Sequence, residues 1–199
     1  LIAVTKTRPF TTIQYCYHSQ ITAIGENRIQ EAAEKFRSFA DMPGLVRRFI
    51  GHLQSNKVNK CLELFDTVDS VDSVKLARRI SNRAAALGKT VPVLLEVNTS
   101  GEPQKGGFDP DQEEDMLTCM KENNIQVEGV MSIGPYSQDQ KAIRKSVSAL
   151  RLRSQALNAQ AGGKILKELS MGMSGDYELA AEEGSTMVRL GTGLFGPRE

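Results

Sequence analysis

Short apolar runs alternate with longer segments of helical spacing along almost the whole chain of 199 residues. Runs of this kind, rich in β-branched residues and bounded by polar residues or glycine, predict strands, and the segments between them predict helices. Because each helix returns the chain to the edge where the preceding strand began, the strands are expected to be parallel. The predicted strands cover residues 1–6, 21–27, 48–53, 64–70, 91–99, 126–133, 166–171 and 187–195.

Several of the intervening segments carry signals for helix starts and stops. Asn27 and Gln30 have the spacing of a capping pair, ahead of apolar residues that recur at helical spacing as far as Ala40. Residues 74–87 contain one apolar stripe, and Gly88 follows as a C-terminal stop. Further helix starts are predicted at Ser55, at Asp109 with Pro110, at Ser137 with Gln140, and at Asp176.

Eight strand–helix units in a chain of 199 residues predict an α/β fold, a single-domain (β/α)8 TIM barrel over residues 1–199. A flavodoxin-like or Rossmann sheet is the alternative, but the GxGxxG that such a sheet carries after its first strand does not follow the first predicted strand here. The eighth predicted strand ends the chain, so we expect no helix after it. The sequence opens at Leu1, directly in a strand, and we therefore expect further residues ahead of it.

Charge and hydropathy exclude several classes of protein. Lys and Arg number 25 and Asp and Glu 24, a net charge of +1, so no overall field favours nucleic acid or an anionic membrane. No apolar stretch approaches the ~18 residues of a membrane span, and the start of the chain lacks a signal-peptide layout. The three cysteines are widely spaced and form no CxxC pair, so neither disulfides nor a metal site is predicted. We expect a cytoplasmic protein.

Lys6 is the first candidate for chemistry. In a parallel barrel the active site lies at the carboxyl ends of the strands, and Lys6 ends the first apolar run, LIAVTK. Burial beside Arg8 would favour the neutral, nucleophilic form of its amine. Such a lysine is suited to a Schiff base with an aldehyde; a lysine that simply extends to solvent is the alternative.

The last two predicted strands end in small and hydroxyl-bearing residues, which suit a phosphate. Ser174 and Gly175 precede a predicted helix, where free N–H groups attract an anion. Gly191, Thr192 and Gly193 form the next turn, where backbone N–H groups can approach a ligand closely. The loops after strands seven and eight are the common phosphate position in barrels. With a lysine on the adjoining first strand, they predict pyridoxal 5'-phosphate (PLP) as a covalently held cofactor.

Arg189 lies two residues before Gly191, on the same side of the predicted strand. A cation there could face the ring nitrogen of the cofactor and keep it unprotonated; a phosphate or carboxylate partner inside the barrel is the alternative. His52 ends a strand and could line the mouth of the barrel. Lys105 lies on the loop after the fifth predicted strand, where nearby glycines would let it reach into the mouth of the barrel, but a solvated loop lysine is the preferred interpretation.

Six stretches of the chain resemble, in order, the signatures of the YggS/PROSC family of pyridoxal phosphate homeostasis proteins. The resemblance implies a barrel similar to the N-terminal domain of alanine racemase, of PLP fold type III, and a helix ahead of the first strand. The chain departs from the family at Arg8, where a second lysine is usual. The stretches are AVTKTRP, IGENRIQEA, FIGHLQSNK, VNTSGEPQKGGF, LSMGMSGDYELA and GSTMVRLGTGLFG.

Carried over residue by residue, the resemblance implies a set of cofactor-binding positions. These are Lys6 as the Schiff-base lysine, Asn27 in the cofactor pocket, Ser174, Gly191 and Thr192 as the phosphate cradle, and Arg189 as the partner of the pyridine nitrogen.

Three functions fit these residues. The first, implied by the resemblance, is a monomeric protein of vitamin B6 homeostasis that buffers PLP or delivers it to apo PLP-dependent enzymes. The second is a PLP-dependent amino-acid racemase of low activity, because a strong racemase needs acid–base groups on both faces of the substrate. The third is a barrel enzyme acting on a phosphosugar, with Lys6 as an aldolase-type lysine.

Overall fold

The computed structural model describes residues 1–102 and 104–197 and contains one closed barrel of parallel strands, paired in chain order from β1 to β8. β1 pairs with β2 and also with β8, where Ile2 lies beside Arg189, so the two ends of the sheet meet. The predicted (β/α)8 barrel is confirmed. Its strands are β1 (Ile2–Val4), β2 (Ala23–Glu26), β3 (Val46–Phe49), β4 (Thr67–Val71), β5 (Val91–Glu96), β6 (Ile125–Met131), β7 (Glu168–Met173) and β8 (Met187–Leu190).

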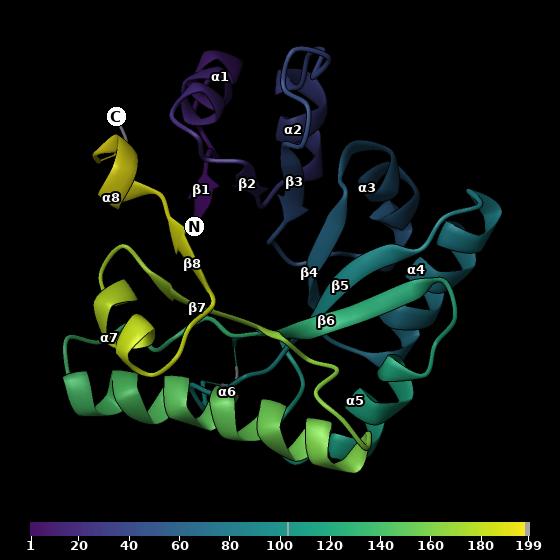
Figure 1. Ribbon diagram of the computed structural model, residues 1–199, viewed down its shortest axis with the longest axis vertical. Helices are drawn as coiled ribbons and strands as arrows, with labels where there is room; N and C mark the ends of the chain where they lie inside the picture. Colours follow the sequence, from purple (N-terminus) through teal and green to yellow (C-terminus); the bar gives the residue numbers. More distant parts are fainter. Residues whose placement is uncertain (103, 198–199) are drawn as a thin grey trace.

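Helices follow the strands and lie around the outside of the sheet (Figure 1). Covering helices on one face and the barrel interior on the other leave β1 and β4 buried along their whole length. The helices are α1 (Phe10–His18), α2 (Ile29–Lys35), α3 (Val58–Leu64), α4 (Val74–Ala86), α5 (Glu113–Met120), α6 (Gln140–Gln160), α7 (Tyr177–Glu182) and α8 (Thr192–Phe195), with a 3-10 turn, η1, at Ser55–Lys57.

A chain of aromatic rings packs the side of the barrel near α2. Phe10, Phe39, Phe36, Phe65 and Phe49 follow one another edge to face, with ring centroids 5.1 to 5.6 Å apart. Such contacts add to the apolar area that the rings bury. They also explain why the predicted helix from Asn27 to Ala40 is too long. α2 ends at Lys35, and the backbone becomes extended at Phe36, so that the rings of Phe36 and Phe39 pack inward.

Several predicted strands end in the wrong place, the third and the eighth by the largest margins. The third was expected over residues 48–53, but its register with β2 runs only from Val46 to Phe49. The eighth was expected to reach residue 195, and the expectation that no helix follows it is wrong. The chain turns at Gly191, whose carbonyl accepts from the N–H groups of Leu194 and Phe195 to form α8.

Helix starts were predicted less well than strands. The helix α1 carries no start signal, and its β-branched and aromatic residues have modest helix propensity. The start at Asp109 is wrong, because Phe108 still pairs in extended form with Val97 and α5 begins at Glu113. Asp139, rather than Ser137, caps α6. The stop at Gly88, which has φ +64°, is confirmed.

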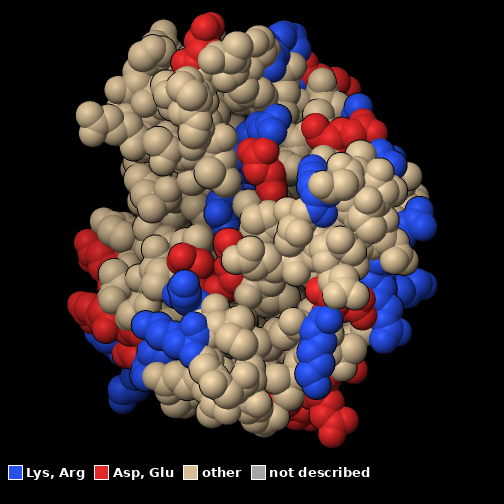
Figure 2. Space-filling view, turned by 45° about the vertical axis from the view of Figure 1, so that its right-hand side comes forward, with Lys and Arg blue, Asp and Glu red and all other residues tan. Residues whose placement is uncertain are grey.

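The surface shows no large region of one charge on the face in Figure 2, where Lys and Arg lie beside Asp and Glu. Among the described residues, no helix combines the length and the apolar character that a membrane crossing requires. All three cysteines are buried and free.

Candidate functional site

A cavity of about 1650 Å³ opens where the strands end in the carboxyl direction. It exceeds the roughly 300–1,000 Å³ of ordinary ligand pockets, so it can hold a small cofactor and still admit a second small molecule. All six predicted cofactor residues line it, although they come from both ends of the chain. They are Lys6, Asn27, Ser174, Arg189, Gly191 and Thr192.

Lys6 lies in a turn directly after β1 and is partly buried. The next residue, Thr7, has φ +63°, a left-handed conformation that β-branched residues rarely adopt. This turn brings Lys6 to the same cavity wall as Val4 and Gly191. The lysine is therefore presented by a strained turn, and not by the strand itself as the sequence predicted.

Backbone N–H groups converge on the Ser174 hydroxyl at the ends of β7 and β8. The Ser174 Oγ accepts from the N–H of Gly193 at 2.9 Å and from that of Gly191 at 3.3 Å. A Cβ at Gly193 would lie 3.2 Å from this hydroxyl, so glycine keeps the approach open. Thr192 begins α8 between the two glycines and is exposed. Two N–H donors and two hydroxyl groups thus gather at one edge of the cavity, a donor set suited to phosphate oxygens.

Arg189 is almost completely buried beneath this edge, with 5% of its surface exposed. One terminal nitrogen donates to the carbonyl and the hydroxyl of Ser170 at 2.8 Å, and the other donates to the carbonyl of Ser132 at 2.8 Å. Burial lowers the pKa of the guanidinium, whereas the nearby carboxylates of Asp69 and Glu96 favour its charged form. Neutral oxygens hold the group in place, and it lines the cavity at a fixed position.

Asn27 follows β2 and lines the cavity instead of capping α2, where Arg28 occupies the cap position without a side-chain bond. A Cβ at Gly51 would come within 2.2 Å of the Asn27 carbonyl oxygen. Glycine at position 51 therefore allows the end of β3 to pass directly beside Asn27. The same approach explains why β3 stops earlier than the sequence predicted.

Glu96 is a cavity residue that sequence reasoning missed. It ends β5 and is 5% exposed. Burial raises the pKa of its carboxyl to about 7, and the negative charge of Asp72 adds to this, while Arg189 and His52 act in the opposite direction. The signal was present, since Glu96 ends the apolar run VPVLLE. Extending the predicted strand to residue 99 concealed it.

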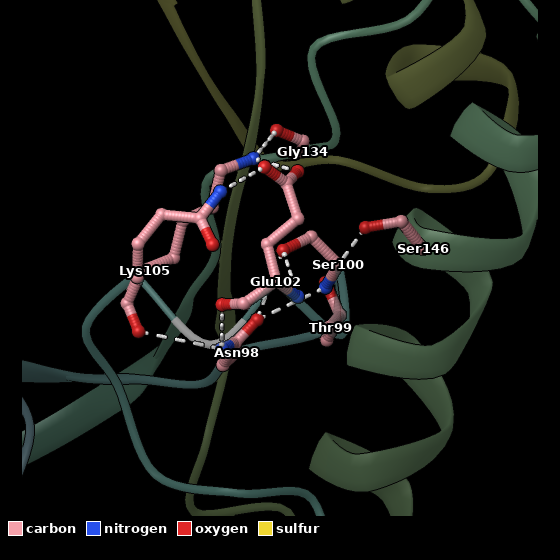
Figure 3. A network of polar contacts seen from close by, with 8 residues as sticks. Asn98, Thr99, Ser100, Glu102, Lys105, Gly134 and Ser146 are labelled. Atoms are coloured by element: carbon pink, nitrogen blue, oxygen red, sulfur yellow. Dashed lines mark hydrogen bonds and ion pairs between the residues drawn. The ribbon is translucent and has the colours of Figure 1, made fainter.

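His52 and Lys105 both line the cavity, in different settings. His52 is largely exposed, with its Nδ1 3.3 Å from a carboxylate oxygen of Asp72. The Lys105 amine donates to the Glu102 carboxylate at 2.6 Å and to the Gly134 carbonyl at 2.8 Å, as Figure 3 shows. Lys105 is therefore not a freely solvated loop lysine, the interpretation that the sequence favoured.

A closed parallel barrel with a lysine, converging backbone N–H groups and a buried arginine at its mouth is consistent with one class of protein, the barrels of the alanine racemase N-terminal domain. The family model with that description matches residues 1–199. A solved alanine racemase from Clostridium difficile shares the fold, with a TM-score of 0.78 at 19% identity over 99% of this chain and 52% of the racemase.

Within that class the chain belongs to the pyridoxal phosphate homeostasis protein family. The protein of that name from Pseudomonas aeruginosa is 40% identical over 200 residues, covering 100% of this chain and 84% of the relative. The structure of PipY from Synechococcus elongatus with PLP bound has a TM-score of 0.89 and 36% identity, covering 98% of this chain and 91% of PipY.

Proposed function

We propose that this chain is a cytoplasmic, monomeric protein of PLP homeostasis, which holds PLP as a Schiff base on Lys6 and buffers it or delivers it to apo PLP-dependent enzymes. One observation carries the proposal. Lys6, the N–H groups at Ser174 and the buried Arg189 border a single cavity, although they come from opposite ends of the chain. The names of the relatives and the PLP bound to PipY support the same cofactor.

We expect one chemically suited group for each of the three anchoring groups of the cofactor. The Lys6 amine would meet the aldehyde, the turn where the Gly191 and Gly193 N–H groups converge on the Ser174 hydroxyl would meet the phosphate, and the Arg189 guanidinium would meet the ring nitrogen. When bound, PLP supplies an electrophilic aldehyde and an electron-withdrawing ring.

Lys6 supplies the covalent step. Its amine would form a carbon–nitrogen double bond with the aldehyde carbon of PLP, and the aldehyde oxygen would leave as water. The reverse reaction with water, or exchange with another amine, frees the cofactor and returns the amine to Lys6. Reversible retention of this kind is what a buffer or carrier requires.

Arg189 favours retention over turnover. A guanidinium keeps its protons at all physiological pH values, so Arg189 would donate a hydrogen bond to the ring nitrogen without protonating it. An unprotonated ring withdraws electrons less strongly and stabilises a carbanion less well. We therefore assign Arg189 the role of holding the cofactor in a weakly reactive state.

The visible spectrum of the purified protein tests the proposal. Added PLP should give a yellow band that borohydride abolishes, and Lys6→Ala should show no such band. Lys60→Ala, on the exposed surface of α3, is the matched control and should behave as the unaltered chain does. A colourless protein that takes up no PLP would remove the cofactor function and favour the phosphosugar enzyme.

Racemisation is the competing activity, because Tyr136 and Tyr177 line the cavity and could act as acid–base groups. Tyr136 is fully exposed, so nothing in its surroundings fixes the hydroxyl at a substrate. Incubation with single L-amino acids and detection of the D-form separates the two functions. Production of the D-form far above the rate of free PLP would make racemisation the function.

A further inference from the structure

The short turn that carries Lys6 is held on both sides by charged residues of α2. The N–H of Thr7, directly after Lys6, donates to the Glu31 carboxylate. The carbonyl of Thr5, directly before Lys6, accepts from the Lys35 amine at 2.9 Å. Each neighbour of Lys6 is thus fixed through its backbone by a different side chain of one helix.

These two side chains are themselves locked together. The Lys35 amine lies 3.2 Å from the Glu31 carboxylate, one helical turn away, and 2.6 Å from Glu26, whose side chain is fully buried. Glu26 also accepts from the Thr5 hydroxyl at 2.6 Å. The Lys35 side chain is only 7% exposed, and removing one partner of a buried ion pair leaves the other charge uncompensated. The side chains of Glu26, Glu31 and Lys35 are therefore held in one stable arrangement.

The turn has a reason to need such support. Thr7 at φ +63° is in a conformation that costs on the order of 1–3 kcal/mol and persists only where its surroundings impose it. On the opposite side, the Arg8 guanidinium lies 2.8 Å from the carbonyl oxygen of Phe195, at the end of α8. That helix begins in the anion cradle, so the turn is connected to α2 on one side and to the cradle on the other.

We propose that Glu31 and Lys35 are positioning residues for Lys6: by fixing the backbone on either side of it, they aim its amine at the site where the aldehyde is held. This inference rests on the proposed function. Neither side chain is among the residues that line the cavity, so both act through the turn and not on the cofactor. Misplacing a reacting group by about 1 Å can slow a reaction about 100-fold.

Schiff-base formation measured by stopped-flow absorbance after mixing the protein with PLP tests the proposal. Glu31→Ala should slow formation about tenfold or more, whereas Glu31→Gln keeps an oxygen acceptor for the Thr7 N–H and should restore most of the rate. Glu34→Ala, on the exposed side of the same helix, is the matched control and should leave the rate unchanged. Unchanged rates in Glu31→Ala would overturn the proposal.

A second pair of variants separates positioning from a general loss of stability. Thr7→Gly adopts a positive φ without strain, so the turn no longer depends on Glu31. In a Thr7→Gly background, Glu31→Ala should slow Schiff-base formation much less than it does alone. Equal slowing in both backgrounds would contradict the proposal.

The two possible failures are distinguishable. If the unaltered protein forms no borohydride-reducible bond with PLP, the proposed function is wrong. If the unaltered protein forms that bond on Lys6 and Glu31→Ala forms it at the same rate, only the positioning role is wrong.

Discussion

The β1–α1 turn, which carries Lys6, and the β5–α5 loop, which carries Lys105, border the same cavity and are held in different ways. The first is fixed through the backbone of the residues flanking its lysine, which bond to Glu31 and Lys35. The second is held in part by the lysine itself, whose amine binds Glu102 and Gly134, and in part by the Asn98 amide, which donates to the carbonyls of Glu102 and Lys105. Replacing Lys6 should therefore leave its turn intact, whereas replacing Lys105 should loosen its own loop. Under the proposed function, the same residue type serves chemistry in one place and structure in the other.

A buried glutamate lies near each of the two lysines. Glu26 is paired with Lys35, and although burial raises the pKa of its carboxyl, the bonds from Lys35 and Thr5 act against this. Glu96 has no such pair among the described contacts, and its pKa rises to about 7. Glu26, which is bonded to Thr5 next to the Lys6 turn, therefore contributes to a fixed ion network, whereas Glu96 changes charge near neutral pH.

The largest expected effect distinguishes the two lysines directly. Lys6→Met should abolish the borohydride-reducible bond and weaken PLP binding by about 100-fold, equivalent to about 3 kcal/mol, with little change in thermal stability. Lys105→Met should retain the bond and weaken PLP binding only a few-fold. Equilibrium titration with PLP and thermal denaturation measure both. The reverse pattern would show that the amine of Lys105, and not that of Lys6, holds the cofactor.

Glu96→Gln should change how stability depends on pH. A carboxyl whose pKa is about 7 in the folded protein and near 4.5 when unfolded binds its proton more tightly in the folded state, so stability falls as pH rises from about 4.5 to 7. The full loss above pH 7 is roughly 3 kcal/mol. Urea unfolding without PLP should show this slope in the unaltered protein and not in Glu96→Gln. Parallel pH profiles for the two proteins would contradict the assignment.

Substitutions at two adjacent glycines test how much space the Lys105 loop leaves for a side chain. Gly107 has φ +111°, and a Cβ there would lie 2.8 Å from the Asn98 backbone nitrogen, so Gly107→Ala should cost roughly 1–3 kcal/mol. Gly106→Ala would place its Cβ 3.8 Å from the Glu96 carboxylate, an ordinary contact, and should cost much less. Urea unfolding compares the two. Equal costs would mean that the loop is less constrained than the distances indicate.

The smallest expected effect concerns the Lys105 ion pair. Glu102→Gln removes its charge and should lower stability by about 0.2–1 kcal/mol, because the pair is partly exposed. Limited proteolysis at the β5–α5 loop should become faster. Glu34→Gln on α2 removes a charge without a described side-chain partner and serves as the control. If both variants were cleaved equally fast, Lys105 would not hold its loop.

The barrel could be predicted from the sequence because alternation of strand and helix signals leaves few topologies. Element ends were less predictable, since they depend on contacts between distant segments. β3 stops where Gly51 meets Asn27, and α2 stops where Phe36 and Phe39 turn toward Phe65 and Phe10. The local spacing of residues in the sequence indicates none of these contacts between distant segments.

The site could be predicted where residues fall at strand ends. Lys6, Ser174, Arg189 and the glycine turn at Gly191 follow from that rule, and they border one cavity. Glu96 was not predicted as a site residue, because the predicted strand extended three residues beyond the end of β5. The support from Glu31 and Lys35 could not be predicted, because it depends on which face of α2 meets the Lys6 turn and on the strained backbone of Thr7.

Peptide mapping after borohydride reduction of the PLP-loaded protein tests the central claim most directly, because it identifies the lysine that forms the bond. After proteolysis and mass spectrometry, the pyridoxyl group should be found on the peptide that contains Lys6, in close to equal molar amount with the protein. Predominant labelling of Lys105, or labelling spread over surface lysines, would contradict the account.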